Sequence, residues 1–389
     1  MRCGENPAIK CRDAGTPRAR YGRTRRRGGA HLILVTGGAG FIGSHVVEAL
    51  ISEGQAVRVL DSLLSHRERP GYLPDEVDFV EADIRDPEAV QKALRGIVHV
   101  CHQAGMVGLG SDFLDITDYV SHNDLGTAVL MRELAQKGFA GRLVLASSMV
   151  VYGEGSYECP HDGAVRPGPR RVGDLEHGQF EPLCPLCGGV LDARPVCENA
   201  PLDPRNVYAA TKVHQEHLGW AFQRENASPV TALRYHNVYG PRMPRDTPYA
   251  GVASLFASAL ANEQAPRVFE DGAQRRDFVH VRDVAHANVL ALLGNRAVSG
   301  AFNVASGQPR SVGELADTLA DATGSDAPRP VRTGEYRRGD VRHVFASPER
   351  AERELGFRAS ESFTAGMREF ATAPLRGERL DQDQSRSSI

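Results

Sequence analysis

Short apolar segments alternate with longer amphipathic segments through most of the first 240 residues, and this alternation predicts the secondary structure. The apolar segments predict buried strands at residues 32–36, 56–60, 77–80, 97–101, 142–146 and 230–235. Segments of helical length separate most of these strands. Because strands that alternate with helices form a doubly wound parallel sheet, we expect a Rossmann-like α/β fold over residues 31–240, with ligands at the carboxyl ends of the strands.

The remaining chain predicts a smaller C-terminal α/β domain over residues 241–374, with a helix at 251–262, a strand at 267–269 and a last helix. Arginines are spread over this half, and a guanidinium binds phosphate oxygens in bidentate fashion. We therefore expect this domain to bind the substrate. Residues 1–30, which are basic, and residues 375–389 are predicted to be disordered tails.

Three glycines, Gly37, Gly40 and Gly43, mark a sharp turn between the first strand and a helix that begins at Phe41. Glycines at this spacing allow a tight turn, close approach of the backbone to a pyrophosphate, and close packing of helix on strand. The N–H groups of the helix N-terminus then face the anion. Asp61 ends the second strand, where a carboxylate binds the adenosine ribose and repels a 2′-phosphate, so we expect NAD rather than NADP.

Two later strand ends extend this predicted cofactor site. Asp83 and Ile84 follow the third strand and are placed to flank an adenine ring, although a helix cap at Asp86 explains the same segment. Gln103 and Ala104 follow the fourth strand, where small residues let a dinucleotide approach the backbone.

A candidate catalytic group combines Ser148, at the end of the fifth strand, with Tyr208 and Lys212 on a later helix. Tyr208 and Lys212 are four residues apart and share a helical face, so the ammonium is predicted to lower the pKa of the phenol and make it a usable base. Only four of the 46 Lys and Arg residues are lysines, which makes this lysine more informative. A polar turn and an exposed helical face are the structural alternatives, whereas a non-catalytic sensor has no need of all three groups.

Residues 154–201 interrupt the α/β pattern with a segment rich in Gly, Pro and Arg. Cys184 and Cys187 form a knuckle whose thiolates chelate one metal, and tetrahedral zinc needs two more ligands. Cys159 is the expected third ligand, and the fourth is either Cys197 or His161. A metal-free loop of reduced cysteines is the alternative, and a disulfide is the least favoured.

Composition excludes some classes of function. The formal net charge of −3 gives no general affinity for nucleic acid or acidic membranes, and the arginines of the insert are offset by acidic residues. No run of about 18 apolar residues predicts a transmembrane helix. No signal-peptide segment precedes the first strand, so the cytoplasm is the expected compartment.

Together these motifs resemble the extended short-chain dehydrogenase/reductase superfamily, in particular its NAD-dependent nucleotide-sugar epimerases and dehydratases. The resemblance covers residues 32–372 and includes the segments 233–242, 276–278 and 337–340 besides those above. It implies cofactor contacts from Gly37, Gly40, Phe41, Ile42, Gly43, Asp61, Asp83, Ile84, Gln103, Ala104, Asn123, Ser147, Tyr208, Lys212 and Tyr235.

The resemblance also implies the chemistry. A tightly held NAD accepts a hydride from C4 of a nucleoside-diphosphate sugar, while Tyr208 takes the 4-hydroxyl proton, Ser148 hydrogen-bonds that oxygen and Lys212 holds the ribose. The substrate phosphates are expected to contact three residues: Asn237, Arg276 and Arg337.

Departures from the family pattern favour one reaction. The family's 4,6-dehydratases carry Asp-Glu directly after the catalytic hydroxyl residue, where this chain has Met149 and Val150. Neither side chain exchanges a proton, so epimerisation at C4 is favoured over dehydration. Decarboxylating relatives also tend to keep an acidic residue there, so decarboxylation is disfavoured as well. A 4-ketoreductase is the main alternative, but it needs NADPH, against which Asp61 argues.

The resemblance further ranks substrates and assembly. The cysteine insert resembles that of bacterial 4-epimerases acting on dTDP-L-rhamnose, which places this sugar slightly ahead of UDP-hexoses and UDP-uronic acids. A homodimer through the helix that carries Tyr208 is usual in the family. Trp220 and Phe222 could serve such an interface, although core packing explains them equally well.

Overall fold

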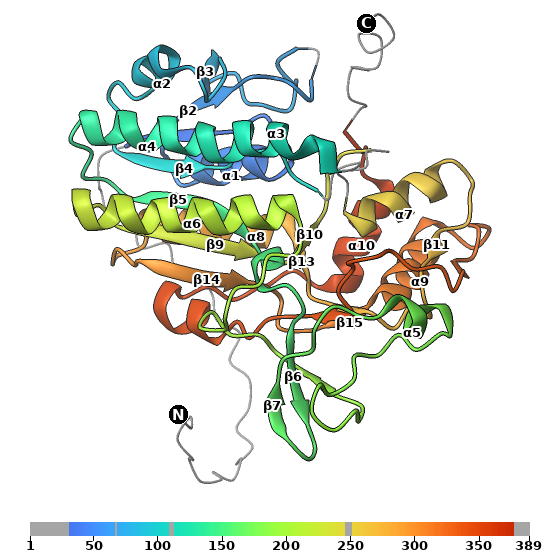
Figure 1. The fold of residues 1–389 in the computed structure, drawn as a ribbon. Helices are drawn as coiled ribbons and strands as arrows, with labels where there is room; N and C mark the ends of the chain where they lie inside the picture. The colour runs from blue at the N-terminus through green and yellow to red at the C-terminus, as the bar shows by residue number, and fades with distance from the viewer. Residues whose placement is uncertain (1–30, 67, 109–112, 246–250, 377–389) are drawn as a thin grey trace, which may run out of the picture. The chain divides into compact units, whose positions relative to one another are not determined.

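Seven strands form the central sheet, in the order β14-β9-β5-β4-β1-β2-β3 (Figure 1). The computed structural model describes residues 31–66, 68–108, 113–245 and 251–376, so the predicted N-terminal tail and the C-terminal tail from residue 377 lie outside the described residues. The strands are β1 (Leu32–Thr36), β2 (Ala56–Asp61), β3 (Asp78–Glu81), β4 (His99–His102), β5 (Leu143–Ser148), β9 (Val230–Tyr235) and β14 (Gly300–Val304).

Every pairing in this sheet is parallel, which confirms the predicted fold class. The six strands predicted from apolar runs are present, whereas β14 was not predicted because its run is short and contains Asn303. The direction of strand order reverses between β1 and β4, and a crevice for ligands opens at such a point, beyond the carboxyl ends of the strands.

Helices cover both faces of the sheet. The helices α1 (Phe41–Ser52) and α8 (Val281–Leu293) pack on one face, and α2 (Pro87–Ala93), α4 (Gly126–Gln136) and α6 (Val207–Asn226) pack on the other. Figure 1 shows α4 and α6 running across the front of the sheet. Ile33 and Val35 of β1 pack in the core beneath α1 and α8, whereas Leu34 packs in the core beneath α2, α4 and α6. Side chains that alternate between the two faces follow from the two-residue period of a strand.

The C-terminal part has its own core between α7 (Val252–Ala261), α9 (Val312–Thr323) and α10 (Phe363–Thr372). Its short strands pair as β10 (Asn237–Tyr239) with β13 (Phe278–His280), β11 (Arg267–Val268) with β16 (Val331–Arg332), and β12 (Arg275–Arg276) with both β15 (Arg310–Ser311) and β17 (His343–Val344). α8 and β14 lie after residue 240 but pack on or join the central sheet. The division into two domains at residue 240 therefore stays a prediction.

Residues 154–201 build a small unit of their own. The antiparallel sheet β7-β6-β8 consists of β6 (Ser156–Cys159), β7 (Gly163–Val165) and β8 (Asp192–Arg194), and α5 (Val172–Glu176) follows β7. Figure 1 shows β6 and β7 extending away from the central sheet. The remaining helical segments are η1 (Phe113–Asp115), α3 (Ile116–Tyr119), η2 (Val120–Leu125), η3 (Met149–Tyr152) and η4 (Ala351–Leu355).

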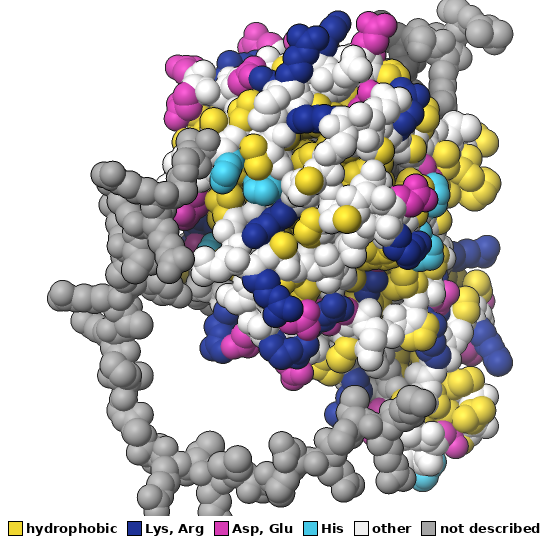
Figure 2. Space-filling model, turned by 90° about the vertical axis from the view of Figure 1, so that its left-hand side faces the viewer, with side chains coloured by type: hydrophobic (Ala, Val, Ile, Leu, Met, Phe, Trp, Pro, Cys, Tyr) yellow, Lys and Arg dark blue, Asp and Glu magenta, His cyan; other side chains and the backbone are white. Residues whose placement is uncertain are grey.

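The surface carries both signs of charge. On the face shown in Figure 2, basic and acidic side chains are interspersed. None of the helices in the described part of the chain has the length and apolar character needed to span a membrane.

Candidate active site

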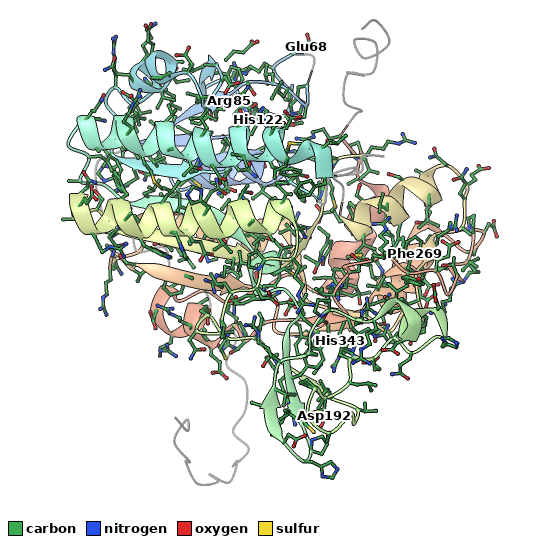
Figure 3. All side chains as sticks on the ribbon, viewed as in Figure 1. Glu68, Arg85, His122, Asp192, Phe269 and His343 are labelled. Atoms are coloured by element: carbon green, nitrogen blue, oxygen red, sulfur yellow. The ribbon has the colours of Figure 1, made fainter. Side chains whose placement is uncertain are left out.

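A cavity of about 1500 Å³ lies at the carboxyl ends of β1, β2, β4, β5 and β9 and continues into the C-terminal part. Figure 3 labels Arg85 and His122 near one end of this cavity and Phe269 near the other, and all three residues line it. Single small-molecule sites typically measure about 300–1,000 Å³, so this cavity has room for two ligands side by side.

The glycine turn lies at the β1 end of the cavity. Gly37 has a φ of +67°, and a Cβ there would lie 2.6 Å from the backbone nitrogen of Ala104. A Cβ on Gly43 would collide with the carbonyl oxygen of Gly37. Gly40 caps α1 and lines the cavity, and a Cβ on it would meet no backbone closer than 3.2 Å. Packing therefore requires two of the glycines, whereas the third, with Phe41 and Ile42 beside it, faces the ligand space.

Asp61 lies at the carboxyl end of β2, at the wall of the cavity. Its two carboxylate oxygens accept the backbone N–H groups of Ala39 and Leu63, each at 2.9 Å. A carboxylate has about four acceptor positions, so two remain for ligand hydroxyl groups. The geometry holds this charge at the place where a ribose is expected.

Asp83 and Ile84 line the cavity after β3. Asp83 accepts a forked hydrogen bond from Arg85, with a shortest N···O distance of 2.6 Å, and this interaction lowers the pKa of the carboxyl group below its usual value. Asp86 caps α2 by accepting the N–H of Glu88 at 2.9 Å. The helix cap at Asp86 is confirmed, and the role of Asp83 and Ile84 beside an adenine ring stays a prediction.

Several predicted cofactor residues are tied into buried networks. Gln103 donates to the hydroxyl of Tyr235 at 2.9 Å and to Oδ1 of Asn288 at 3.1 Å. Gln103 and Tyr235 line the cavity. Asn288 was missed from the sequence, although a polar residue on a buried helix face is a recognisable signal.

Asn123 and Ser147 act as supports of the site. The amide of Asn123 accepts the N–H of Met106 at 2.7 Å and donates to Thr211 at 3.0 Å, and it is not among the residues that line the cavity. It joins the loop after β4 to α6. Ser147 donates its hydroxyl to Glu216 at 2.5 Å, beneath the cavity wall.

The structure brings Ser148, Tyr208 and Lys212 together at one wall of the cavity. The hydroxyl group of Ser148 acts on that of Tyr208 and lowers the pKa of the phenol. Lys212 donates to the carbonyl oxygen of Ala146 at 2.8 Å, and its Nζ lies 5.8 Å from the centre of the Tyr208 ring. Asn206 accepts the N–H of Ala209 and caps α6, which starts the helix at the turn that carries Tyr208.

The pKa values of this group differ from the expectation. Burial raises the pKa of Tyr208 to about 12, and only the hydrogen bond with Ser148 opposes this rise. Burial also lowers the pKa of Lys212 to about 8, against the opposing charges of Asp124 and Glu216. In the protein alone burial therefore dominates the pKa of Tyr208, and Lys212 is not among the groups that lower it. A second positive charge in the cavity is needed before Tyr208 acts as a base near neutral pH.

The opposite end of the cavity is cationic. Arg276 and Arg337 line it, and neither guanidinium has an ion pair among the residues that the structure describes. Oδ1 of Asn237 is buried there and has no hydrogen-bond partner within the described ranges. Asp340, which was not assigned a role from the sequence, lies at the same end, where burial raises its pKa. This arrangement suits an anionic ligand that also carries hydrogen-bonding groups.

Comparison with known proteins identifies the family. The sequence profile of the NAD dependent epimerase/dehydratase family matches residues 33–172 and 187–305. The chain belongs to this family. It is 32% identical over 347 residues to a dTDP-L-rhamnose 4-epimerase of Burkholderia thailandensis, a match that covers 87% of this chain and 94% of that protein. The chain is accordingly an enzyme of the NAD-dependent epimerase family.

Solved structures of the same family share its fold. A UDP-glucose 4-epimerase of Thermus thermophilus in complex with NAD matches with a TM-score of 0.70 and 30% identity, over 87% of this chain and 97% of that one. A UDP-glucose 4-epimerase of Thermotoga maritima with UDP-glucose matches with a TM-score of 0.72 and 28% identity, over the same shares of the two chains.

The family profile leaves residues 173–186 unmatched, and a possible metal site lies partly in this segment. The ligand atoms of Cys159, Asp162, Cys184 and Cys187 all lie within 4.8 Å of one another. Cys197 and His161, which were predicted as alternative fourth ligands, lie outside this group, and Asp162 takes the fourth position in it. The turn after β6 brings Asp162 back beside Cys159. Asp162 was missed from the sequence, where the Cys-x-x-Asp spacing of 159–162 is the only signal for it.

Proposed function

We propose that this enzyme inverts C4 of a nucleoside-diphosphate sugar by transient oxidation and re-reduction. The observation that carries the proposal is the grouping of Ser148, Tyr208 and Lys212 in a cavity that is also lined by Arg276 and Arg337, which have no ion pair among the described residues and suit a diphosphate. Met149 and Val150 line the cavity directly after Ser148, so the positions at which dehydratases carry an acid and a base are apolar. Epimerisation needs no further proton-exchanging group.

The residues of the first half of the cavity fit NAD. The cavity side of Gly40 leaves room for the close approach of a pyrophosphate, and Asp61 has two acceptor positions left for ribose hydroxyls. NAD bound there supplies a hydride acceptor and a positive charge near Tyr208. The side chains of this chain then move the proton: Tyr208 removes it from the 4-hydroxyl group, with Ser148 holding the oxygen, and returns it after the 4-keto sugar has turned over.

The sugar is proposed as dTDP-L-rhamnose ahead of UDP-hexoses and UDP-uronic acids. The Burkholderia relative named as a dTDP-L-rhamnose 4-epimerase supports this order, while the UDP-glucose 4-epimerases support the second choice.

The experiment that tests the proposed function is incubation of the purified enzyme with a panel of dTDP- and UDP-sugars without added cofactor, followed by NMR of the ring protons. Inversion at C4 alone, without net consumption of cofactor, is the expected result, whereas turnover only with NADPH would assign the protein to the ketoreductases.

Replacing Asp61 with Asn is expected to weaken NAD binding about tenfold and to reduce the preference for NAD over NADP. The variant removes the charge that binds the ribose, and hydrogen bonds to charged groups contribute about 1.5–3 kcal/mol. Calorimetric titration of both cofactors measures the change. Asp86→Asn is the control, because Asp86 only caps α2 and Asn caps equally well. A wild-type protein that prefers NADP would contradict the assignment of Asp61.

We propose that a zinc ion is bound by four side chains of the insert: Cys159, Asp162, Cys184 and Cys187. Zinc–sulfur bonds of about 2.3 Å place tetrahedral thiolates roughly 3.8 Å apart, and the sulfurs of Cys159 and Cys187 are 3.5 Å apart. The N–H of Leu186 points at the sulfur of Cys184 with a distance of 3.4 Å, which stabilises a thiolate. Three thiolates and one carboxylate are a suitable ligand set for structural zinc.

A homodimer is proposed, with the face around α3, η2 and α6 as the interface. Phe113 is 72% exposed, Val120 is 44% exposed and Leu125 is 51% exposed, although all three are large and apolar. Trp220 and Phe222 pack in the core beside α4 instead, so their role is explained without an interface. Light scattering is expected to give about twice the chain mass of 42.2 kDa. The mass of a single chain at micromolar concentration would contradict this proposal.

A further inference from the structure

We propose that the cysteine insert is a metal-dependent clamp that holds the diphosphate-binding Arg276 in place. The inference rests on the proposed function, because it assigns the clamp to the binding of the same nucleotide substrate. Four insert residues form the insert clamp, since each bonds to the segment 340–343 or to its partners: Glu154, Tyr157, Arg170 and Glu181.

The first arm of the insert clamp runs along β6. Cys159 of the metal group ends this strand, and Tyr157 lies two residues before it. The hydroxyl of Tyr157 donates to Glu154 at 2.7 Å and accepts the N–H of His343 at 3.1 Å. Glu154 also accepts the N–H of Arg342 at 2.6 Å. A metal bound at Cys159 therefore anchors the strand whose neighbours hold the backbone of 342–343.

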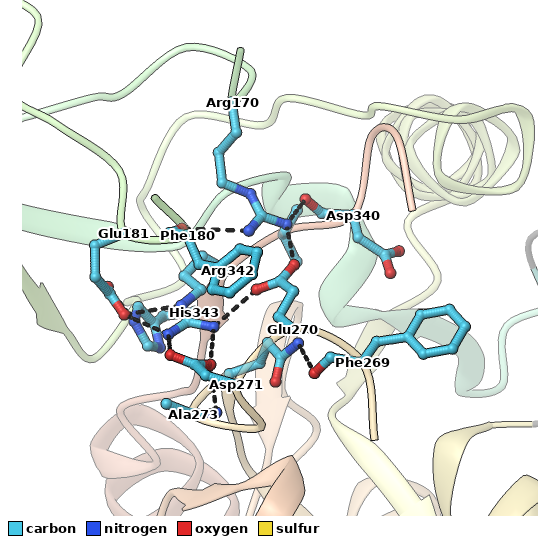
Figure 4. Close-up of polar contacts among 12 residues, drawn as sticks. Arg170, Phe180, Glu181, Phe269, Glu270, Asp271, Ala273, Asp340, Arg342 and His343 are labelled. Atoms are coloured by element: carbon cyan, nitrogen blue, oxygen red, sulfur yellow. Dashed lines mark hydrogen bonds and ion pairs between the residues drawn. The ribbon is translucent and has the colours of Figure 1, made fainter. Parts of the chain in front are cut away.

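The second arm runs from the knuckle. Glu181 lies three residues before Cys184, and its carboxylate accepts the guanidinium of Arg342 at 2.6 Å and contacts the ring of His343 at 2.8 Å (Figure 4). Burial opposes ionisation of Glu181, but the hydrogen bonds from His343 and Arg342 prevail and lower its pKa to about 2. The carboxylate of Glu181 is therefore ionised at neutral pH.

A third contact comes from Arg170, between the two arms. Figure 4 shows its guanidinium between the carboxylate of Glu270 and the carbonyl oxygen of Asp340, at 2.8 Å from each. Arg342 is 1% exposed and pairs with Glu270 from the other side at 2.7 Å. The insert thus forms hydrogen bonds to both ends of the segment 340–343.

Residues 341–343 in turn orient Arg276. Its guanidinium donates to the carbonyl oxygens of Val341 at 2.7 Å and of Arg342 at 2.8 Å. The strand that carries it, β12, pairs with β17, and the ring of His343 accepts the N–H of Arg275 at 3.1 Å. These carbonyls fix the position of the Arg276 guanidinium, which lines the cavity. It has no ion pair in the described part of the chain, although the charge of Asp340 acts on it.

None of the four clamp residues lines the cavity, and the catalytic group lies outside the clamp. The clamp therefore acts by positioning. Its loss is expected to weaken ground-state and transition-state binding equally, which raises KM and leaves kcat unchanged. Glu181 and Cys184 lie in the segment that the family profile leaves unmatched, so the second arm lies outside the matched part of the family pattern.

The test compares two variants of the full-length enzyme. Cys184→Ser is expected to lose the zinc, measured by mass spectrometry, and to raise both KM and the Kd for UDP or dTDP about tenfold, with kcat within twofold of wild type. Glu181→Gln is expected to keep the zinc and to show the same rise, because it removes the negative charge that holds Arg342 and His343. Arg342 retains Glu270 and Asp271, so the variant is expected to fold. This second variant keeps the test decisive if Cys184→Ser does not fold.

The controls lie in the same insert. Cys197→Ser and Glu158→Gln remove a cysteine and a carboxylate that belong neither to the metal group nor to the clamp, and both are expected to match wild type. An unchanged nucleotide Kd in zinc-loaded Glu181→Gln would overturn the clamp, and wild-type enzyme without zinc would overturn its metal dependence. If no nucleotide sugar is turned over but the nucleotide Kd rises as stated, the proposed function fails and the clamp stands.

Discussion

Replacing Tyr208 with Phe is expected to lower kcat about 10³-fold while NAD binding is retained. General acid–base catalysis contributes typically 10²–10⁴-fold, and Tyr208, which lies beside Ser148 at the cavity wall, is the proposed base for the 4-hydroxyl group. The aromatic ring and Lys212 remain, so the cofactor pocket keeps its shape. Single-turnover NMR of the sugar, with the cofactor content measured in parallel, separates the two effects.

The pH profile gives the same prediction a second readout. Because burial raises the pKa of Tyr208 to about 12 in the protein alone, the phenol is protonated at neutral pH. The rate of wild-type enzyme is expected to rise with pH on the acid limb, and Tyr208→Phe is expected to lack that limb. Tyr72→Phe, which removes a phenol bonded to the carbonyl of Ala39, is the control and should keep the wild-type profile. A Tyr208→Phe variant with kcat within tenfold of wild type would assign the base elsewhere.

The sequence predicts what depends on local pattern. The strands that precede the ligand crevice, the glycine turn at Gly37, and the spacing of Tyr208 and Lys212 are local features, and each is found where the pattern places it. Apolar runs and helical periodicity are set by the nearest neighbours in the chain, so a sequence reports them well. The family profile covers the same regions.

What the sequence does not predict depends on contacts between distant segments. Asn123 binds Thr211 across 88 positions of the chain, and no local pattern shows that its amide supports a loop. Asp162 joins the cysteines because a hairpin turns there, and Arg342 is buried because Glu181 meets it from 161 positions away. The raised pKa of Tyr208 likewise reflects burial by the whole fold rather than its neighbour at i+4.

Replacing Glu216 with Leu is expected to lower the free energy of unfolding by about 3–5 kcal/mol, because it leaves a buried charge without its partner. Glu216 is 1% exposed and accepts Arg234 at 2.9 and 2.7 Å as well as Ser147 at 2.5 Å. Arg234 would keep only the hydroxyl of Tyr152 and the carbonyl of Glu198. Urea unfolding of the cofactor-free protein measures the loss.

Two companion variants separate the burial of charge from the loss of a carboxylate. Glu133→Leu also removes a buried glutamate, but its partner Arg132 is 54% exposed and solvated, so a loss of about 1 kcal/mol or less is expected. The double variant Arg234→Met with Glu216→Leu removes both charges and is expected to recover most of the stability. Equal losses in Glu216→Leu and Glu133→Leu would mean that Arg234 finds water or another partner.

The same change reaches the catalytic group. The charge of Glu216 raises the pKa of Lys212 against the effect of burial, so its removal is expected to lower that pKa further below about 8. Since a lysine loses its charge as the pH rises through its pKa, the variant should lose the Lys212 ammonium at a lower pH than wild type. The alkaline limb of the rate profile is therefore expected to move toward neutral pH in Glu216→Leu and to stay in place in Glu133→Leu. Such a shift would show that the buried ion pair of Glu216 and Arg234 sets the charge of Lys212 in the catalytic group.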